Sequence, residues 1–324
     1  MNGGRAVIEL LSVQRKSAVL TPSKLPCMAR MPSINLTAGC AHGCVYCYAQ
    51  GYCGHPGHDK VVVYANLLEK LRDELSRRRE PPAAVCFSSS SDLFQPVPEV
   101  LDLAFDVLDL LLRRRIGVVF LTKGRIPRRH MDLLTANAPW VRAQIGLVTL
   151  DRRLLRIFEP RTATPYVRLE QARTLVDAGI ATQVRLDPIL PGVTDDPDAL
   201  HALCAALADV GIREIAASTL FLRPALAGIL YNRLKRPKMF RRLAEAFEPR
   251  RWLRLKTDRG RVLTLSPARR RQTFDWLTAI ARQYGITVRI CGCKNPDLTA
   301  QTCHMAGPWS PPEIVERQLA LFAP

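Results

Sequence analysis

The sequence contains no long hydrophobic run. None of its 324 residues falls in a stretch of about 18 consecutive apolar side chains, which is the length that a membrane-spanning helix needs. The short apolar patch near the N-terminus includes Glu9 and lacks a small-residue cleavage site, so it does not have the pattern of a secretory signal. We therefore expect a cytoplasmic protein without a membrane partner. In that reducing compartment its ten cysteines should serve metal binding or catalysis and not disulfides.

Aromatic residues are also scarce. They make up only 6% of the chain, which leaves little material for the base-stacking platforms of proteins that bind single-stranded nucleic acid. Apolar residues make up 48%, which is too many for a disordered chain. A chain of this length can bury a sizeable core, either as one large α/β domain or as two smaller ones.

Acidic residues are few compared with basic ones. The 29 Asp and Glu face 47 Lys and Arg, which gives a formal net charge of +18. Residues 233–271 hold 15 of the basic residues and three acidic ones. Since Lys and Arg that contact phosphates release condensed counterions, this segment is predicted to bind a polyanion such as DNA or RNA. The shorter basic runs 77–79, 113–115 and 125–129 are interpreted as solvated charges near predicted helix ends.

The hydrophobic pattern alternates between strands and helices. Six such units with short connections predict a parallel α/β sheet, either barrel-like or doubly wound. The predicted strands are 34–39, 83–91, 117–124, 142–150, 181–190 and 214–222, and the helices are 65–78, 99–114, 128–137, 164–178 and 197–210. The pattern then changes to basic helices, a hairpin at 253–265, a helix at 271–284 and a cysteine-bearing tail. We therefore divide the chain into a lead-in (1–33), an α/β unit (34–224) and a C-terminal extension (225–324).

Three cysteines follow the first predicted strand. Cys40, Cys44 and Cys47 lie where the carboxyl edge of a parallel sheet gathers its functional residues. Zinc would need a fourth ligand, for which His42, Cys53, His55 and His58 are candidates. An iron–sulfur cube can be held by three thiolates, which leaves one iron open to another ligand. The spacing of three and then two residues favours the cube without excluding zinc.

A second group of cysteines occurs near the C-terminus. Cys291, Cys293 and Cys303, followed by His304, lie in a loop rich in Gly, Pro and Asn, where structural core cysteines would not cluster. We interpret the group as a metal site, either an auxiliary iron–sulfur cluster on three thiolates or zinc with His304 as fourth ligand. The alternative is a redox-active or radical-relaying thiol, for which Cys53 and Cys303 are the candidates. Cys86 and Cys204 are predicted to be core thiols.

The motif Cys40-x3-Cys44-x2-Cys47, with Tyr46 before the last cysteine and a partial β/α barrel behind it, resembles the radical S-adenosylmethionine (SAM) superfamily. The longer string GCAHGCVYCYA resembles the spore photoproduct lyase-like, or DNA-repair-photolyase-like, branch. Further similar segments follow in order: SSSSDLFQPVPE, LTKG, FEPRTATPYVRLE and RLDPILPGVTDD. The resemblance covers roughly residues 15–224 and implies a partial (β/α)6 barrel, followed here by the basic, cysteine-bearing extension.

The resemblance implies a set of cofactors. Cys40, Cys44 and Cys47 would ligate a [4Fe-4S] cluster whose fourth iron binds S-adenosyl-L-methionine. Reductive cleavage would give a 5′-deoxyadenosyl radical that abstracts hydrogen from a substrate. The reductant would be a protein such as flavodoxin or ferredoxin. Many enzymes of the superfamily carry a second cluster in a C-terminal extension, so we favour that interpretation of the tail, although the tail itself departs from spore photoproduct lyase.

The resemblance also implies cofactor-binding residues. Ser90, Ser91 and Asp92 would meet the methionine amine, with Asp92 as the acceptor. Lys123 would meet the methionine carboxylate, Arg185 the carboxylate or the ribose, and Tyr46 would lie near adenine. Each has a structural alternative: Asp92 as a turn cap, Lys123 as a solvated charge, and Arg185 as a paired charge on the sheet face opposite Val184.

Three functions therefore stay open at this point. The first is a radical SAM enzyme acting on nucleic acid, in repair or modification. The second is a radical SAM enzyme acting on a small molecule or peptide, with the C-terminal cysteines as auxiliary cluster or substrate site. The third is a zinc-dependent nucleic-acid-binding protein, which explains the charge and the cysteines but not the six β/α units.

Overall fold

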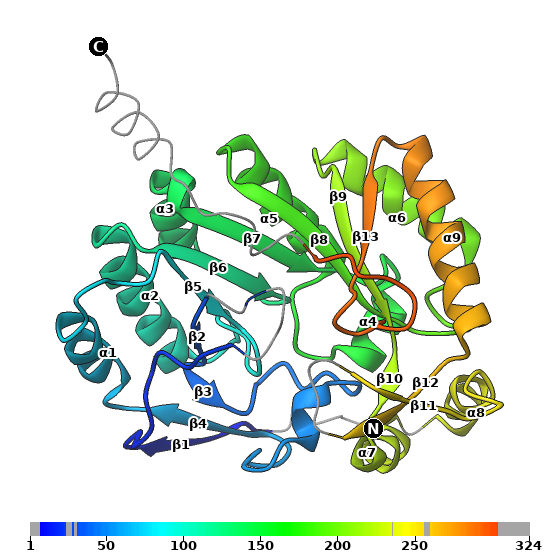
Figure 1. Cartoon of the computed structure of the whole chain (residues 1–324), viewed down its shortest axis with the longest axis horizontal. Coiled ribbons are helices and arrows are strands. Elements are labelled where there is room, and N and C mark those ends of the chain that lie inside the picture. The colour runs from blue at the N-terminus through cyan, green and yellow to red at the C-terminus, as the bar shows by residue number, and fades with distance from the viewer. Residues whose placement is uncertain (1–6, 24–27, 29–30, 235, 256–259, 304–324) are drawn as a thin grey trace.

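The computed structural model describes residues 7–23, 28, 31–234, 236–255 and 260–303. Helices and strands carry the labels of Figure 1. No helix in this part of the chain is long and apolar enough to cross a membrane.

One parallel sheet of seven strands forms the centre of the protein (Figure 1). Its order is β2-β5-β6-β7-β8-β9-β13, and each neighbouring pair runs parallel. Because the strand number rises steadily across the sheet, the winding has one direction, as in a barrel, and lacks the reversal of a doubly wound sheet. The strands are Ser33–Ile34 (β2), Ala84–Phe87 (β5), Gly117–Thr122 (β6), Val141–Gly146 (β7), Ala181–Ile189 (β8), Glu214–Thr219 (β9) and Thr287–Ile290 (β13).

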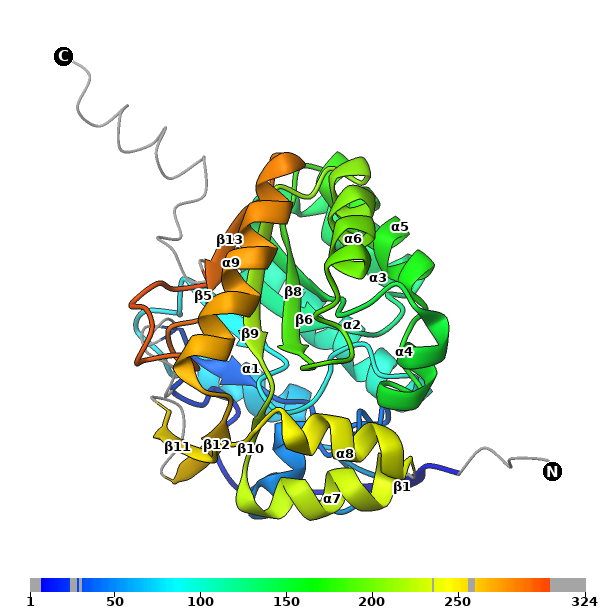
Figure 2. The same cartoon turned by 90° about the vertical axis from the view of Figure 1, so that its right-hand side faces the viewer.

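Helices cover the outer face of this sheet, as the view in Figure 2 shows for α5, α6 and α9. Their apolar residues recur three and four positions apart, so each buries one stripe against the strands. On α2, for example, Ala104, Leu108 and Leu111 are completely buried in the main core. The helices are Leu67–Ser76 (α1), Pro98–Arg113 (α2), Arg128–Ala136 (α3), Pro165–Asp177 (α5), Pro197–Asp209 (α6) and Pro267–Gln283 (α9).

The two faces of the sheet differ in polarity because side chains alternate along each strand. Val184 and Leu186 of β8 belong to the main core under the helices. Arg185 and Asp187 therefore project from the opposite face, which we call the inner face. The C-terminal segment 291–303, drawn orange to red in Figure 1, lies against this inner face, since Cys291 and Lys294 contact β8 side chains.

Two smaller sheets lie below the carboxyl edge of the main sheet (Figure 1). The first has the order β1-β4-β3, and the second pairs β12 antiparallel with both β10 and β11. Three further helices pack here around a second core that includes Tyr46, Leu226 and Leu230. These elements are Glu9–Val13 (β1), Thr37–Ala38 (β3), Lys60–Tyr64 (β4), Arg152–Phe158 (α4), Phe221–Leu222 (β10), Pro224–Leu234 (α7), Pro237–Glu245 (α8), Arg251–Arg254 (β11) and Arg261–Thr264 (β12).

The predicted fold class is confirmed, and three local differences have physical reasons. The first predicted strand, 34–39, is divided between β2 and β3, which belong to different sheets. The second predicted strand ends at Phe87, because Ser88 adopts a positive φ and turns the chain into a loop. The sequence analysis also missed β13, since four residues beside a cysteine cluster carry too weak a pattern. As a result, α9 and β13 of the predicted extension complete the main sheet.

Candidate functional site

The loop with the first three cysteines begins after β3 and ends at the short 3-10 helix Tyr48–Gly51. Two glycines with positive φ give it its tight course. A Cβ on Gly39 would lie 2.4 Å from the carbonyl oxygen of Lys60, and one on Gly43 would lie 2.6 Å from Arg161 Nη2. The close approach of these neighbours holds the loop against the edge of the sheet.

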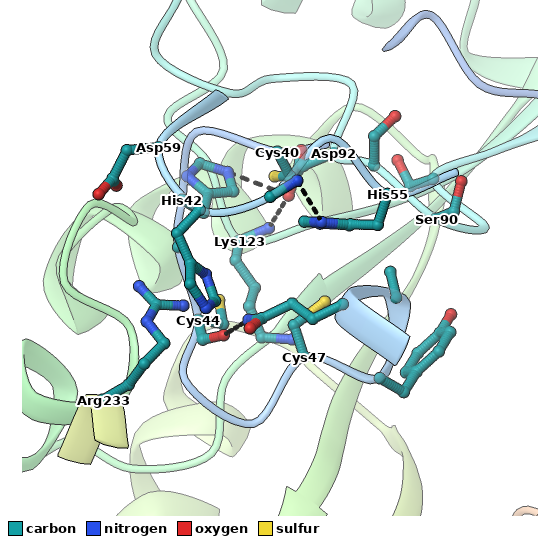
Figure 3. Close-up of a pocket in the computed structure, with 18 of the residues that line it drawn as sticks. Cys40, His42, Cys44, Cys47, His55, Asp59, Ser90, Asp92, Lys123 and Arg233 are labelled. Atoms are coloured by element: carbon teal, nitrogen blue, oxygen red, sulfur yellow. Dashed lines mark hydrogen bonds and ion pairs between the residues drawn. The ribbon is translucent and has the colours of Figure 1, made fainter. Parts of the chain in front are cut away.

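One pocket joins this loop to the carboxyl ends of β5 and β6 (Figure 3). The predicted residues that line it are Cys40, Cys44, Cys47, Ser90, Ser91, Asp92 and Lys123. Tyr46 and Arg185, which were also predicted to bind cofactor, do not line this pocket. The pocket wall further includes His42, His55, Asp59 and Arg233, of which Arg233 reaches in from α7. The three thiols thus share the pocket with the hydroxyls of Ser90 and Ser91 and with the ammonium group of Lys123.

The surroundings of Cys40 and Cys44 determine the protonation state of their thiols. Burial, followed by the negative charge of Asp92, raises the pKa of Cys40 to about 12. Burial and then Glu159 also raise the pKa of Cys44, while Lys123 opposes the rise. The protein alone therefore keeps Cys40 and Cys44 as neutral thiols, and a bound metal would have to displace their protons.

No three Cys, His, Asp or Glu side chains among the described residues are arranged to hold one metal ion. A cubane cluster makes a different demand, because each thiolate binds its own iron at a separate corner. Three thiols on one pocket wall fit this donor pattern.

Asp92 is fully engaged by the protein itself. Its Oδ1 accepts hydrogen bonds from the Phe94 amide (2.8 Å) and from Thr122 Oγ1 (2.7 Å), and its Oδ2 accepts one from the Lys123 amide (2.8 Å). His42 Nε2 lies 3.2 Å from Oδ2, close enough for an ion pair when the ring is protonated. Hydrogen bonds thereby use three of the four acceptor directions of the carboxylate, and His42 lies near the fourth. The structure thus favours the structural alternative for Asp92, which ties the end of β6 to the cysteine loop.

Lys123 and Tyr46 lie next to a buried ion pair behind the cysteine loop. Glu159 and Arg168 form a 2.5 Å salt bridge in which both side chains are completely buried. The Tyr46 hydroxyl donates a hydrogen bond to Glu159, and Lys123 Nζ lies 5.7 Å from the centre of the Tyr46 ring. Burial raises the pKa of Glu159, but the charges of Arg168 and then Lys123 outweigh it and hold that pKa below its ordinary value. The Tyr46 side chain therefore anchors the loop from behind.

Arg185 belongs to a second cluster on the inner face. Its Nη2 lies 2.8 Å from Asp187 and 3.8 Å from the sulfur of Cys291. Asp187 is shared with Lys294. The prediction that Arg185 faces away from Val184 is confirmed, and its charge is paired within the protein.

The structure brings the three C-terminal cysteines together around the same point. Hydrogen bonds with Cys293 and then Cys303 lower the pKa of the Cys291 thiol. All three side chains are buried. His304, the candidate fourth zinc ligand, lies outside the described residues. Of the two relay candidates, Cys303 belongs to this cluster, whereas Cys53 is exposed and does not line the three-cysteine pocket.

The two predicted core thiols have different surroundings. Cys204 of α6 is completely buried in the main core, as predicted. Cys86 of β5 packs with Met28, Met31 and Val119 on the inner face, and its pKa is raised by burial and then by Cys303. It therefore neighbours the second cysteine cluster.

The basic segment 233–271 is only partly a surface. Arg250, Arg251 and Arg254 are exposed on and beside β11. Arg270, in contrast, is 2% exposed and pairs with Asp297, while Arg233 lines the pocket. Residues 235 and 256–259 lie outside the described part of the chain. The predicted polyanion surface thus comprises α8 and the β11–β12 hairpin.

The sequence analysis also missed a group of aromatic and basic side chains. The Arg223 guanidinium lies 4.5 Å from the ring centre of Tyr52 and 5.8 Å from that of Tyr48, the residue after Cys47. Lys294 Nζ lies 5.3 Å from the Tyr48 ring. Three segments distant in the sequence bring these side chains together beside the cysteine loop.

Fold and site together define a partial β/α barrel with a thiol-lined pocket at its carboxyl edge. Residues 34–204 match the family model of the Radical SAM superfamily. This stretch is more than half of the chain, and the chain belongs to that superfamily. Membership in it implies a [4Fe-4S] cluster and S-adenosylmethionine. A zinc-dependent binding protein without enzymatic activity does not fit this membership.

Curated relatives cover part of the chain. An uncharacterized protein of Mycobacterium tuberculosis is 29% identical over 218 residues, which are 64% of this chain and 64% of the relative. A radical SAM Nα-GlyT isomerase of a Pseudomonas phage is 29% identical over 213 residues, which are 65% of this chain and 42% of the isomerase. The chain thus spans less than two thirds of the length of these relatives.

A solved structure of a spore photoproduct lyase variant with bound AdoMet and dinucleoside spore photoproduct has a TM-score of 0.67. The match covers 86% of this chain and 81% of that one at 19% identity. A further variant of the same lyase gives a TM-score of 0.66 at 18% identity. At these identities the likeness establishes the fold.

Proposed function

We propose that this enzyme reductively cleaves S-adenosylmethionine at a [4Fe-4S] cluster bound by Cys40, Cys44 and Cys47, and acts on nucleic acid. The observation that carries the proposal is the convergence of these three thiols on one pocket with the ends of β5 and β6. When bound, the cofactors supply a 5′-deoxyadenosyl radical that abstracts hydrogen from the substrate.

The chain offers charge compensation for a cluster at this place. Three thiolates in a partly buried pocket need cations nearby, because an uncompensated buried charge is costly. The charge of Lys123 opposes the rise that burial and Glu159 cause in the pKa of Cys44, and the Arg233 guanidinium faces both Cys44 and Cys47 across the pocket. These two cations suit a negatively charged cluster complex.

The pocket also offers partners for the methionine part of the cosubstrate. Since Asp92 is used by the protein, the hydroxyls of Ser90 and Ser91 are the acceptors we propose for the methionine amine. Lys123 is the proposed partner of the carboxylate. The Tyr46 side chain points to Glu159, so its proposed contact with adenine is made by its backbone.

Nucleic acid as the substrate is supported by charge and by the aromatic group beside the cysteine loop. Exposed arginines of the β11–β12 hairpin suit a phosphate backbone, and Tyr48, Tyr52 and Arg223 can stack on bases near the reacting centre. The lyase with the same fold holds a dinucleoside. The same basic surface suits an acidic one-electron donor such as flavodoxin or ferredoxin.

A small molecule or peptide is the second candidate substrate. The tail lies over the inner face, where Lys294 and Asp187 form an ion pair across it. A sheet face covered in this way suits a compact substrate.

Deuterium transfer distinguishes the two substrates. The reconstituted enzyme is incubated anaerobically with S-adenosylmethionine, dithionite and fully deuterated oligonucleotides, and the 5′-deoxyadenosine formed is weighed by mass spectrometry. Hydrogen abstraction from nucleic acid makes the product one mass unit heavier. Unlabelled oligonucleotides in deuterated water serve as the control. A product of ordinary mass with deuterated DNA and RNA would reject nucleic acid while leaving cosubstrate cleavage intact.

A further inference from the structure

The C-terminal cysteines lie on the inner face of the sheet, apart from the three-cysteine pocket. None of Cys291, Cys293 and Cys303 lines that pocket. Tyr48 lies between the two sites: it follows Cys47 in the chain, and its ring lies 5.3 Å from Nζ of Lys294, the residue after Cys293. The molecule thus has two separate groups of three cysteines.

We propose that Cys291, Cys293 and Cys303 bind a second iron–sulfur cluster on the inner face of the sheet. This inference goes beyond the proposed function, which requires only the cluster at Cys40, Cys44 and Cys47.

A glycine brings the three thiols together. Gly292 separates Cys291 from Cys293, and a Cβ at this position would lie 2.6 Å from the carbonyl oxygen of Gln301. Its amide donates a 3.0 Å hydrogen bond to that same oxygen. Only a residue without a side chain allows the two segments to run this close. This contact places Cys303 close to the turn formed by Cys291, Gly292 and Cys293.

Buried polar side chains hold the turn that contains Cys291 and Cys293 in place. Arg270 Nη2 lies 2.5 Å from Asp297 Oδ2, and Arg270 Nη1 donates to Asn295 Oδ1 at 3.1 Å. Asn295 Nδ2 in turn donates to the Cys291 carbonyl at 3.0 Å. Arg270 is 2% exposed and Asn295 is 1% exposed. Such buried, mutually satisfied groups hold a loop in one conformation, as a metal site requires.

Positive charge is placed where a thiolate cluster needs it. Three thiolates on a cubane core give a net negative complex, which is costly to bury without a cation. The Arg185 guanidinium lies 3.8 Å from the Cys291 sulfur. Lys294 lies in the same ion-pair network through Asp187.

The donor set described at this site is three thiols. A closed zinc site takes four protein ligands, so zinc would also need a ligand outside the described residues, such as His304. The neighbour of Cys291 beyond the other two thiols is Arg185, a cation that cannot ligate a metal. Three soft thiolates suffice for a cube with one open iron.

The test measures iron, sulfide and zinc in anaerobically reconstituted full-length protein. In the triple variant Cys40→Ala, Cys44→Ala, Cys47→Ala, the second cluster should retain about four irons and four sulfides per chain. In the variant Cys291→Ala, Cys293→Ala, Cys303→Ala, iron should fall from about eight to about four. Cys204→Ala, which removes a buried core thiol, is the matched control and should keep about eight.

Three results would overturn the proposal. The first is a triple variant at Cys40, Cys44 and Cys47 that folds but holds no iron. The second is zinc without iron in that variant. The third is alkylation of all three C-terminal thiols in reconstituted wild-type protein. If the C-terminal triple variant fails to fold, the first variant and the alkylation of the wild-type protein still test whether the second cluster is present. None of these results bears on whether the wild-type protein cleaves its cosubstrate at Cys40, Cys44 and Cys47. The proposed function is therefore tested separately.

Discussion

Arg168 Nη2 lies 2.5 Å from Glu159 Oε2, and both side chains are completely buried behind the cysteine loop. The Tyr46 hydroxyl donates to the same carboxylate, which joins the pair to the segment between Cys44 and Cys47. The pair also fixes the main chain, because Arg168 Nη1 donates to the Gly146 carbonyl at the end of β7. One buried ion pair thus connects the end of β7 to the segment that carries Cys44 and Cys47.

Replacing Glu159→Gln leaves the Arg168 charge buried without its partner. We expect the free energy of unfolding to fall by about 3–5 kcal/mol, the usual cost of breaking a buried pair. Urea unfolding of the purified chain measures this, with Glu170→Gln on the exposed face of α5 as the control. A Glu159→Gln variant as stable as the control would show that the pair does not hold the loop.

Asp92 and Ser90 should respond in opposite ways. Asp92→Asn removes the charge that accepts from the Phe94 and Lys123 amides, so stability should fall by about 1.5–3 kcal/mol. Ser90→Ala should keep wild-type stability and weaken S-adenosylmethionine binding in equilibrium dialysis. Wild-type stability with a selective loss of binding in Asp92→Asn would restore the direct amine contact that the sequence analysis predicted.

Neutralising the β11 arginines should change the salt dependence of nucleic-acid binding. Each phosphate contact contributes about 0.9 to the slope of log affinity against log salt. Replacing Arg250, Arg251 and Arg254 with Gln should reduce that slope, as measured by fluorescence anisotropy with a DNA duplex. The same change at Arg77, Arg78 and Arg79, exposed at the end of α1, should leave it unaltered. Equal slopes for both variants would show that the hairpin arginines make no phosphate contacts.

The Arg270–Asp297 pair should give the C-terminal loop an acid-sensitive stability. The hydrogen bond from Arg270 holds the pKa of Asp297 below its ordinary 3.8. A lowered folded-state pKa stabilises above the unfolded-state value and loses that contribution as pH falls through the folded-state value. Arg270→Gln should therefore cost about 1.5–3 kcal/mol at neutral pH, and the difference from wild type should shrink below about pH 3.8. A difference that stays constant well below that pH would contradict the pairing.

The parts that the sequence predicted share one property: their signal is local. Apolar periodicity located the six predicted units, and the spacing of Cys40, Cys44 and Cys47 located the pocket. Val184 and Leu186 flank Arg185 in the sequence, so its face of the sheet followed from alternation alone.

The parts that the sequence did not predict depend on contacts between distant segments. Glu159 and Arg168 lie in a motif used for the resemblance, but only the fold brings Tyr46 onto them. Asp92 was given a cofactor role by the resemblance, since its partners His42, Thr122 and Lys123 are distant from it in the sequence. Arg270 was counted with the surface charge because its burial depends on Asp297, 27 residues later.

Cleavage of the cosubstrate tests the central claim most directly. Anaerobically reconstituted wild-type protein is mixed with S-adenosylmethionine and dithionite, and 5′-deoxyadenosine and methionine are quantified by chromatography. We expect both products from wild type and from Cys204→Ala, and neither from Cys40→Ala, Cys44→Ala or Cys47→Ala. Continued formation of 5′-deoxyadenosine in any of these three variants would contradict the assignment of the radical-generating cluster to this pocket.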